Sequence, residues 1–332
     1  MKDDLLHGGA LDRMRAAFPD APEPWADLST GVNPWPYPDT AIDAAALRHL
    51  PDNAAMDACR AAMAAAFATP ADSLLLAPGS ELLIRMLPNA IAPKRVVILS
   101  PTYGDHARVW RAAGVDVTET NAPLAHADTA DAVVLCNPNN PDGRVFDRQD
   151  LDTARRRLAA RGGWLIVDEA YADINPDLSL APMGGGDGLV ILRSMGKFFG
   201  LAGLRLGALI APKSVQHAMA ERLGVWPVSG PALAIGRRAY QGTAWADDMR
   251  AQLSEARRRL DAVLKAGGLS ITGGTDLFRY VETDNAHALW AQLARAGLYV
   301  RRFPWSERHL RIGLPASADV ETRLAAALTP SS

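Results

Sequence analysis

The chain has 332 residues, of which 48% are hydrophobic and 22% are charged, so it is long and apolar enough to form a sizeable globular core. Its formal net charge is −2 and it contains no block of basic residues, which argues against a nucleic-acid partner. Two isolated cysteines, no apolar stretch of membrane-spanning length and no signal-peptide core predict a cytoplasmic protein without disulfides, bound metal or membrane contact.

The first segment, residues 1–38, is rich in glycine and proline. Alternating prolines in its PWPYP end exclude a helix there and predict an extended arm. His7 and Asn33 are polar groups of this arm, and turn formation is the simplest local explanation for both. From about Ala41 two alanine-rich stretches predict helices, with the sequences AIDAAALRHL and MDACRAAMAAAFA.

A short apolar strand is predicted at Leu74–Ala77, followed by the turn Gly79-Ser80-Glu81 and a helix that starts near Ser80. The Ser80 hydroxyl can cap this helix, and the free N–H groups of the first helical turn can bind an anion. A plain helix cap and a phosphate site are both open interpretations at this point.

Between residues 95 and 210 the chain alternates between apolar runs and helical patterns. Continuous apolar strands separated by helices indicate an α/β fold with a mostly parallel sheet covered by helices. With Leu74–Ala77 the predicted sheet has seven strands, and the other six are Arg95–Leu99, Val115–Thr118, Ala132–Cys136, Gly163–Val167, Leu189–Leu192 and Leu206–Ile210.

After Ala211 the pattern changes to a long charged helix at about Ala244–Ala266 and then to shorter elements, which predict a smaller α+β domain. The expected strands are Leu269–Thr272, Leu277–Val281, Leu298–Phe303 and His309–Gly313, with helices at Ala286–Ala296 and Ala318–Leu328. We therefore expect a large domain at residues 39–212. Residues 1–38 and 213–332 would form the arm and the small domain.

Polar side chains follow the apolar strands at their carboxyl ends. In a parallel sheet these ends meet at one edge, where ligands collect. Five residues are therefore expected to lie close together: Tyr103, Asn140, Asp168, Tyr171 and Lys197.

The stretch Leu189–Gly207 carries the most informative of these residues. Lys197 lies between a buried strand and an apolar, glycine-rich loop, a poor place for a solvated charge but a suitable one for an amine that forms a Schiff base. Ser194 and Arg205 are residue types that hold phosphate. An ordinary surface loop is the competing interpretation, and the residues at the other strand ends argue against it.

Taken together, the strand-end residues match the functional groups of pyridoxal 5′-phosphate. Asp168 can face the protonated pyridine nitrogen, which makes the ring an electron sink, and Tyr103 can stack on the ring. Asn140 and Tyr171 can hydrogen-bond the phenolate oxygen, and Lys197 can hold the cofactor as a Schiff base. The phosphate group is expected to bind at Gly79, Ser80, Glu81, Ser194 and Arg205.

The order of six short motifs resembles the fold-type-I pyridoxal-phosphate enzymes of the aspartate aminotransferase superfamily, over essentially the whole chain. The motifs are GSE at 79–81, PTYG at 101–104, NPNNPDG at 137–143, DEAY at 168–171, SMGK at 194–197 and GLRLG at 203–207. The resemblance implies the fold of these enzymes, a homodimer, and Lys197, Asp168 and Tyr171 as catalytic residues. Within the superfamily, the chain looks like the histidinol-phosphate aminotransferase group and is most similar to threonine-phosphate decarboxylases of cobalamin biosynthesis.

This narrower resemblance rests on HGG at 7–9, DLSTGVNP at 27–34 and the segment 301–315. It implies that Arg311 binds the α-carboxylate of a small phosphorylated amino-acid substrate. It also implies that His7, Asn33 and Arg301 hold the phosphate monoester of the substrate. Gly31 and Asn140 are the other implied substrate-binding residues.

Three positions qualify the resemblance. Arg302 competes with Arg301, because neighbouring strand residues face opposite ways, and the motif favours Arg301. Leu50 stands where histidinol-phosphate aminotransferases usually place a tyrosine that is donated across the dimer. Gly196 stands where a serine or threonine usually precedes the lysine, so Ser194 is expected to supply the hydroxyl for the cofactor phosphate.

The implied reaction is decarboxylation of L-threonine O-3-phosphate to (R)-1-amino-2-propanol O-2-phosphate. The main alternative is an aminotransferase acting on histidinol phosphate or a related phosphorylated amine, since the same residues would serve it while a different Cα bond breaks. A third possibility is a cofactor-binding regulator without turnover. Such regulators of the superfamily carry an added DNA-binding module, for which this sequence shows no basic segment.

Overall fold

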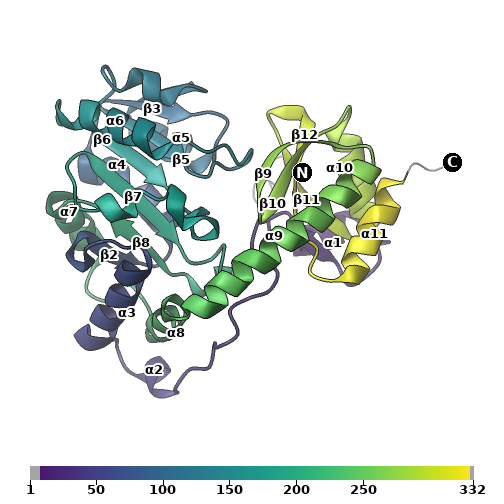
Figure 1. Cartoon of the computed structure of the whole chain (residues 1–332), viewed down its shortest axis with the longest axis horizontal. Helices are drawn as coiled ribbons and strands as arrows, with labels where there is room; N and C mark the ends of the chain where they lie inside the picture. Colours follow the sequence, from purple (N-terminus) through teal and green to yellow (C-terminus); the bar gives the residue numbers. More distant parts are fainter. Residues whose placement is uncertain (1–7, 330–332) are drawn as a thin grey trace. The chain divides into compact units, whose positions relative to one another are not determined.

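The computed structural model describes residues 8–329, and their contacts divide the chain into two compact units (Figure 1). The larger unit comprises residues 37–140 and 144–245. The smaller unit comprises the described residues up to Pro36, the three-residue segment Pro141–Gly143 and the described chain from Ala246 onward. The domain boundary expected near residue 212 differs from this division. Helix α7 (Lys213–Leu223) packs against α4 (Ser80–Ile91), and helix α8 (Gly230–Gln241) packs against α3 (Asn53–Ala66), so both belong to the larger unit.

The larger unit contains the predicted mostly parallel sheet of seven strands, in the order β2-β8-β7-β6-β5-β3-β4 among the described residues. Strand β8 is antiparallel to both of its neighbours, and the other pairings are parallel. The bounds are Leu74–Ala77 (β2), Arg95–Leu99 (β3), Asp116–Thr120 (β4), Ala132–Cys136 (β5), Trp164–Asp168 (β6), Leu189–Ser194 (β7) and Gly207–Ile210 (β8).

The helices of this unit are Ala45–Arg48 (α2), Asn53–Ala66 (α3), Ser80–Ile91 (α4), Asp105–Ala112 (α5), Arg148–Ala159 (α6), Lys213–Leu223 (α7) and Gly230–Gln241 (α8). The first helix expected after Ala41 is reduced to α2. It begins four residues later than expected, where Oδ1 of Asp43 accepts the N–H of Ala45 at 2.8 Å. It ends two residues early because a residue that precedes a proline, here Leu50 before Pro51, disfavours the helical conformation. Helices α3 and α8 lie side by side (Figure 1).

Alternating side chains divide the sheet into two buried faces. Ile98, Val134, Ile166 and Leu192 belong to one apolar cluster with residues of α4, α5 and α7. The intervening residues, among them Leu165, Val167 and Ile191, are equally buried on the opposite face. Because both faces are covered, the strands appear in the sequence as continuous apolar runs.

The smaller unit contains a sheet in the order β1-β11-β12-β10-β9. Part of the predicted extended arm forms its edge strand, because β1 (Ala26–Leu28) pairs in parallel with β11 (Leu298–Phe303). The remaining elements are β9 (Ser270–Thr275), β10 (Phe278–Glu282), β12 (Ser306–Gly313), α1 (Leu11–Ala17), α9 (Thr243–Ala266), α10 (Ala286–Arg295) and α11 (Ala318–Leu328). The first residues of α9, up to Trp245, belong to the larger unit. None of the helices within residues 8–329 combines the length and apolar character needed to cross a lipid bilayer.

The core assignment predicts different costs for the same substitution at two isoleucines. Ile98 is fully buried in β3, so Ile98→Ala is expected to lower the free energy of unfolding by about 2–5 kcal/mol. Ile42 is 40% exposed, and Ile42→Ala is expected to change it by less than about 0.5 kcal/mol. Urea unfolding of both variants checks this, and equal costs would contradict the assigned core.

Candidate active site

The larger unit holds a cavity of about 250 Å³ at the carboxyl ends of its parallel strands. Every residue expected to bind the cofactor lines it except Gly79, which precedes the lining residue Ser80. The lining residues are Ser80, Glu81, Ile84, Tyr103, Cys136, Asn140, Asp168, Ala170, Tyr171, Ser194, Lys197 and Arg205. The fold thus brings together residues from strand ends that lie far apart in the sequence.

The start of α4 and Arg205 form one end of the cavity. Gly79 has a φ of +88°, and a Cβ added there would lie 2.7 Å from Nη2 of Arg205. Gly79, and not Ser80, occupies the position before the helix, and no side chain caps it. The first N–H groups of α4 are therefore free of a side-chain cap, as an anion site requires.

Lys197 lies in the turn that follows β7 and is partly buried. Ser194 ends the strand, and its side chain points to the same face as Leu192 because side chains alternate along the strand. Gly196 approaches the backbone closely, since a Cβ there would lie 3.0 Å from Cα of Ala202. This contact explains why a glycine precedes the lysine in this chain.

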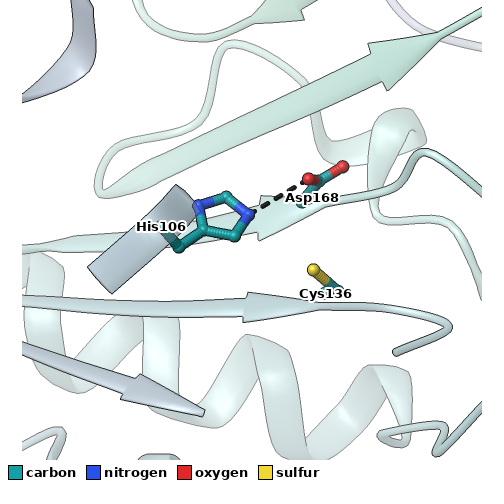
Figure 2. A group of neighbouring side chains, drawn as sticks. All are labelled: His106, Cys136 and Asp168. Atoms are coloured by element: carbon teal, nitrogen blue, oxygen red, sulfur yellow. Dashed lines mark hydrogen bonds and ion pairs between the residues drawn. The ribbon is translucent and has the colours of Figure 1, made fainter. Parts of the chain in front are cut away.

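Asp168 is paired with a residue that the sequence analysis missed. Nε2 of His106, at the start of α5, lies 3.1 Å from Oδ2 of Asp168, and both side chains are buried (Figure 2). The backbone N–H of Ala170 donates to Oδ1 of Asp168 at 3.0 Å. Burial alone lowers the pKa of His106, but hydrogen bonds with Asp168 and Cys136 outweigh it and raise that pKa to about 10.

Tyr103 is held at the cavity wall by two carboxylates. Its hydroxyl lies 2.9 Å from Oε2 of Glu81 and 3.1 Å from Oδ2 of Asp105. Arg85 pairs with Glu81 at 2.7 Å, and Arg108 pairs with Asp105 at 2.6 Å. Burial and the two carboxylates raise the pKa of Tyr103 far above its usual range, so the phenol stays protonated. The Glu81 carboxylate therefore contacts Tyr103.

The asparagine-rich turn after β5 is fixed by its own side chains. Oδ1 of Asn137 accepts the Phe146 N–H at 2.9 Å, and Oδ1 of Asn139 accepts the Thr102 hydroxyl at 2.7 Å. These bonds tie the turn to its neighbours and leave Asn140 at the cavity wall. Tyr171, two residues beyond Glu169, is almost fully buried at the same wall.

The expected substrate-binding residues other than Asn140 belong to the smaller unit, apart from His7, which lies outside the described residues. Arg311 is buried, and its Nη2 donates to the carbonyl of Ser29 at 2.6 Å. Oδ1 of Asn33 accepts the N–H of Trp35 at 2.9 Å, and Gly31 has a φ of +60°.

The sheet of the smaller unit distinguishes Arg301 from Arg302. Arg301 is the direct cross-strand partner of Arg311, so the two side chains point to the same face. Arg302 lies with its guanidinium 4.3 Å from the Trp290 ring centroid, on the face that α10 covers. Arg301 thus shares a face with Arg311, and its role in substrate binding stays a prediction.

The cavity fits pyridoxal phosphate group by group. A lysine amine is available for the aldehyde and a carboxylate for the pyridine nitrogen, and an aromatic ring is available for stacking. Asn140 and Tyr171 can serve the ring oxygen. At the other end, Gly79 leaves room beside Arg205, and the start of α4 and Ser194 offer the donors that a phosphate group would need.

Comparison with known proteins agrees with this geometry. The chain matches the family described as Aminotransferase class I and II over residues 27–328. A threonine-phosphate decarboxylase from Sinorhizobium sp is 42% identical over 99% of this chain and 98% of the relative. Another from Pseudomonas aeruginosa is 39% identical over 98% of this chain and 97% of the relative.

Among solved structures, the histidinol-phosphate aminotransferase from Sinorhizobium meliloti in complex with pyridoxal-5′-phosphate has the same fold. Its TM-score is 0.83 at 19% identity, over 96% of this chain and 94% of that one.

Gly79→Ala is expected to weaken binding of pyridoxal phosphate by about tenfold or more, because the new Cβ displaces Arg205 and removes a charge-assisted hydrogen bond. Gly203→Ala is the matched control, since no atom lies within 4 Å of its added Cβ. Absorbance titration with the cofactor measures both. Equal affinities would show that Arg205 does not hold the phosphate.

His106 makes the stability of the cofactor-free protein depend on pH. Its folded-state pKa, about 10, lies above the ordinary 6.5, so its contribution is complete below pH 6.5 and is lost as the pH rises towards 10. The free energy of unfolding should therefore fall over this range, and His106→Gln should flatten the fall. Urea unfolding at several pH values tests this, and an unchanged slope in the variant would contradict it.

Proposed function

The chain belongs to the class I and II aminotransferase family, and on this premise we propose that it decarboxylates L-threonine O-3-phosphate to (R)-1-amino-2-propanol O-2-phosphate. The observation that carries the proposal is the near-complete match to two relatives named threonine-phosphate decarboxylase, at 42% and 39% identity. The product is the aminopropanol unit that cobalamin biosynthesis requires.

The cofactor is pyridoxal 5′-phosphate. When bound, it supplies a conjugated ring that takes up the electron pair of the bond broken at the substrate's Cα. Lys197 Nζ holds the cofactor and, once free, delivers the proton that replaces the carboxylate on Cα. Asp168, with His106 behind it, holds the proton on the pyridine nitrogen. The balance is one C–C bond broken, one CO₂ released and one C–H bond formed.

Substrate recognition is assigned to basic and polar groups. We propose that Arg311 binds the α-carboxylate and that Arg301, Asn33 and His7 hold the phosphate monoester, with Gly31 and Asn140 beside the substrate. A bidentate guanidinium suits both anions, because its planar fork matches carboxylate and phosphate geometry. These groups would also decide which Cα bond stands perpendicular to the ring, and hence which bond breaks.

The competing activity is transamination of histidinol phosphate or a related phosphorylated amine. It would use the same cavity but break the Cα–H bond. A transaminase also needs a keto acid that restores its cofactor, so only that activity responds to 2-oxoglutarate.

Further expectations belong to the same proposal. A homodimer is expected because enzymes of this superfamily build their sites at a two-fold interface. The cytoplasmic location and the lack of a nucleic-acid partner follow from the sequence composition and stay predictions.

Lys197→Ala is expected to lower CO₂ release from L-threonine O-3-phosphate by about 10²–10⁴-fold or more, because the cofactor anchor and the proton carrier are lost together. Lys213→Ala is the matched control, since that lysine side chain is 69% exposed, and it should keep full activity. The assay follows CO₂ and, by NMR, aminopropanol phosphate.

The outcomes separate the candidates. Formation of both products by the wild type supports the decarboxylase. Amino-group transfer from histidinol phosphate to 2-oxoglutarate without CO₂ release would instead identify an aminotransferase.

A further inference from the structure

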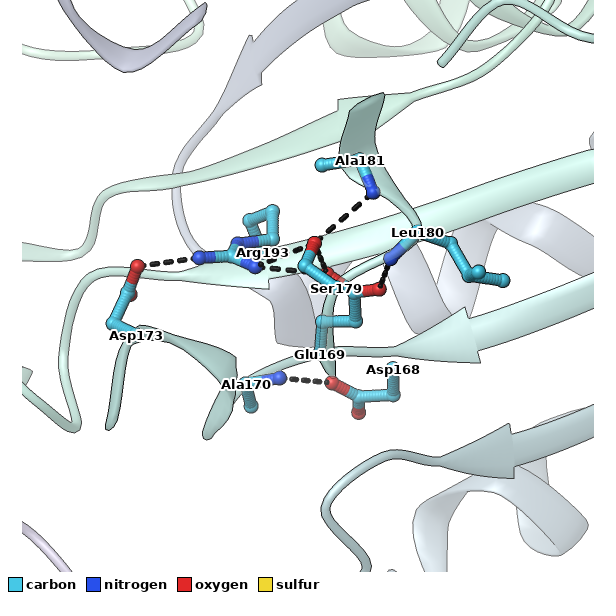
Figure 3. Close-up of polar contacts among 8 residues, drawn as sticks. All are labelled: Asp168, Glu169, Ala170, Asp173, Ser179, Leu180, Ala181 and Arg193. Atoms are coloured by element: carbon cyan, nitrogen blue, oxygen red, sulfur yellow. Dashed lines mark hydrogen bonds and ion pairs between the residues drawn. The ribbon is translucent and has the colours of Figure 1, made fainter. Parts of the chain in front are cut away.

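Arg193 lies at the centre of a buried charge cluster (Figure 3). Its Nη1 donates to Oε2 of Glu169 at 2.8 Å, and its Nη2 pairs with Oδ1 of Asp173. The ring of Phe67 covers the guanidinium at 4.1 Å. One arginine therefore binds two buried carboxylates at once, a task for which its forked geometry is suited.

This cluster lies on the opposite face of the sheet from the cofactor groups. Ser194 and Leu192 point towards the face covered by α4 and α5, so Arg193 between them points to the other face. Asp168 and Glu169 divide in the same way, since Asp168 meets His106 of α5 and Glu169 meets Arg193. No member of the cluster lines the cavity.

The two carboxylates stand on either side of Tyr171 in the chain. Glu169 precedes this tyrosine by two residues and Asp173 follows it by two, so Arg193 binds the side chains of a residue on each side of it. The carboxylate of Glu169 also accepts the Ser179 hydroxyl at 2.5 Å and the Leu180 N–H at 2.7 Å. These bonds join the two ends of the segment 169–180, and Arg193 lies between its carboxylates.

Stability alone does not account for such a cluster. Burying ion pairs costs desolvation energy, and apolar side chains of similar volume stabilise a core as well or better. A charge cluster does, however, specify geometry, because each carboxylate can satisfy its hydrogen bonds in only a narrow range of positions. Tyr171 is the residue whose position the cluster would fix, since it lies midway between Glu169 and Asp173 and lines the cavity.

We propose that Arg193 is a positioning residue that, by binding Glu169 and Asp173 together, fixes the Tyr171 phenol against the cofactor's ring oxygen. This inference rests on the proposed cofactor chemistry and adds to it a residue that touches neither cofactor nor substrate. Because Ser194 follows Arg193 directly, the same cluster also ties the phosphate end of the cavity to the ring-oxygen end.

The test is a double-mutant cycle on the protein loaded with pyridoxal phosphate. The variants are Arg193→Lys, Tyr171→Phe and the double variant, and the reading is the pH midpoint of the bound cofactor's absorption change. Lysine keeps the charge but cannot bind both carboxylates through a planar fork. Arg193→Lys should shift the midpoint by about half to one pH unit in the same direction as Tyr171→Phe, the scale of one altered hydrogen bond.

The double variant gives the decisive comparison. If Arg193 acts through the phenol, Arg193→Lys should cause no further shift once Tyr171 is phenylalanine. Additive shifts, or a fall in melting temperature with no midpoint shift, would overturn the proposal. If the wild-type protein takes up no cofactor at all, the proposed function falls and this inference falls with it.

Two further sets of variants separate positioning from folding. Arg279→Lys in the smaller unit changes an arginine that pairs with Asp261 at 2.7 Å, and it should lower the melting temperature without moving the midpoint. If Arg193→Lys fails to fold, Glu169→Gln and Asp173→Asn replace it in the cycle, since each neutralises one of the two carboxylates that Arg193 binds. A shift that Tyr171→Phe abolishes supports the proposal, and a shift that persists overturns it.

Discussion

Two consecutive carboxylates at the end of β6 impose the constraint on which the site depends. Asp168 and Glu169 follow a run of buried apolar residues, and each is itself buried. Because consecutive side chains point to opposite faces of a sheet, one partner cannot serve both charges. His106 from α5 meets Asp168 on one face, and Arg193 from β7 meets Glu169 on the other. Ion-pair contacts on both faces of the sheet thus fix the end of β6, where Asp168 lines the cavity.

The residues that line the cavity do not distinguish decarboxylation from transamination. Its lysine, aspartate, tyrosine and phosphate-binding groups would serve decarboxylation and transamination equally, because both begin with the same cofactor held in the same way. The choice between breaking the bond to the carboxylate and the bond to hydrogen depends on the groups that orient the substrate. In the smaller unit the pairing of β11 with β12 puts Arg301 and Arg311 on one face and leaves Arg302 to pack against Trp290.

Most of the secondary structure could be predicted because its signals are local. The apolar runs of β3, β5 and β7 and the charged repeat of α9 appear in the sequence at nearly their observed bounds. Predictions failed where a neighbour overrides local preference. The helix expected after Ala41 begins only at Ala45 and ends before a proline. Gly79 rather than Ser80 occupies the position before α4, where its φ of +88° is not helical. The sequence does not predict the role of His106, because nothing in its local sequence distinguishes it from other helix residues, although it follows Tyr103 by three residues.

The sequence by itself determined the chemistry of the cavity, since the residue types that follow each strand and the topology of a parallel sheet together require them to meet at one edge. Only the tertiary structure decided how those groups are held. The contacts of Asp168 with His106 and of Arg193 with Glu169 join residues far apart in the chain, and no periodicity or spacing encodes which side chains of adjacent elements face each other. Which side chains pair depends on how the elements pack against one another, and that packing exists only in the folded chain.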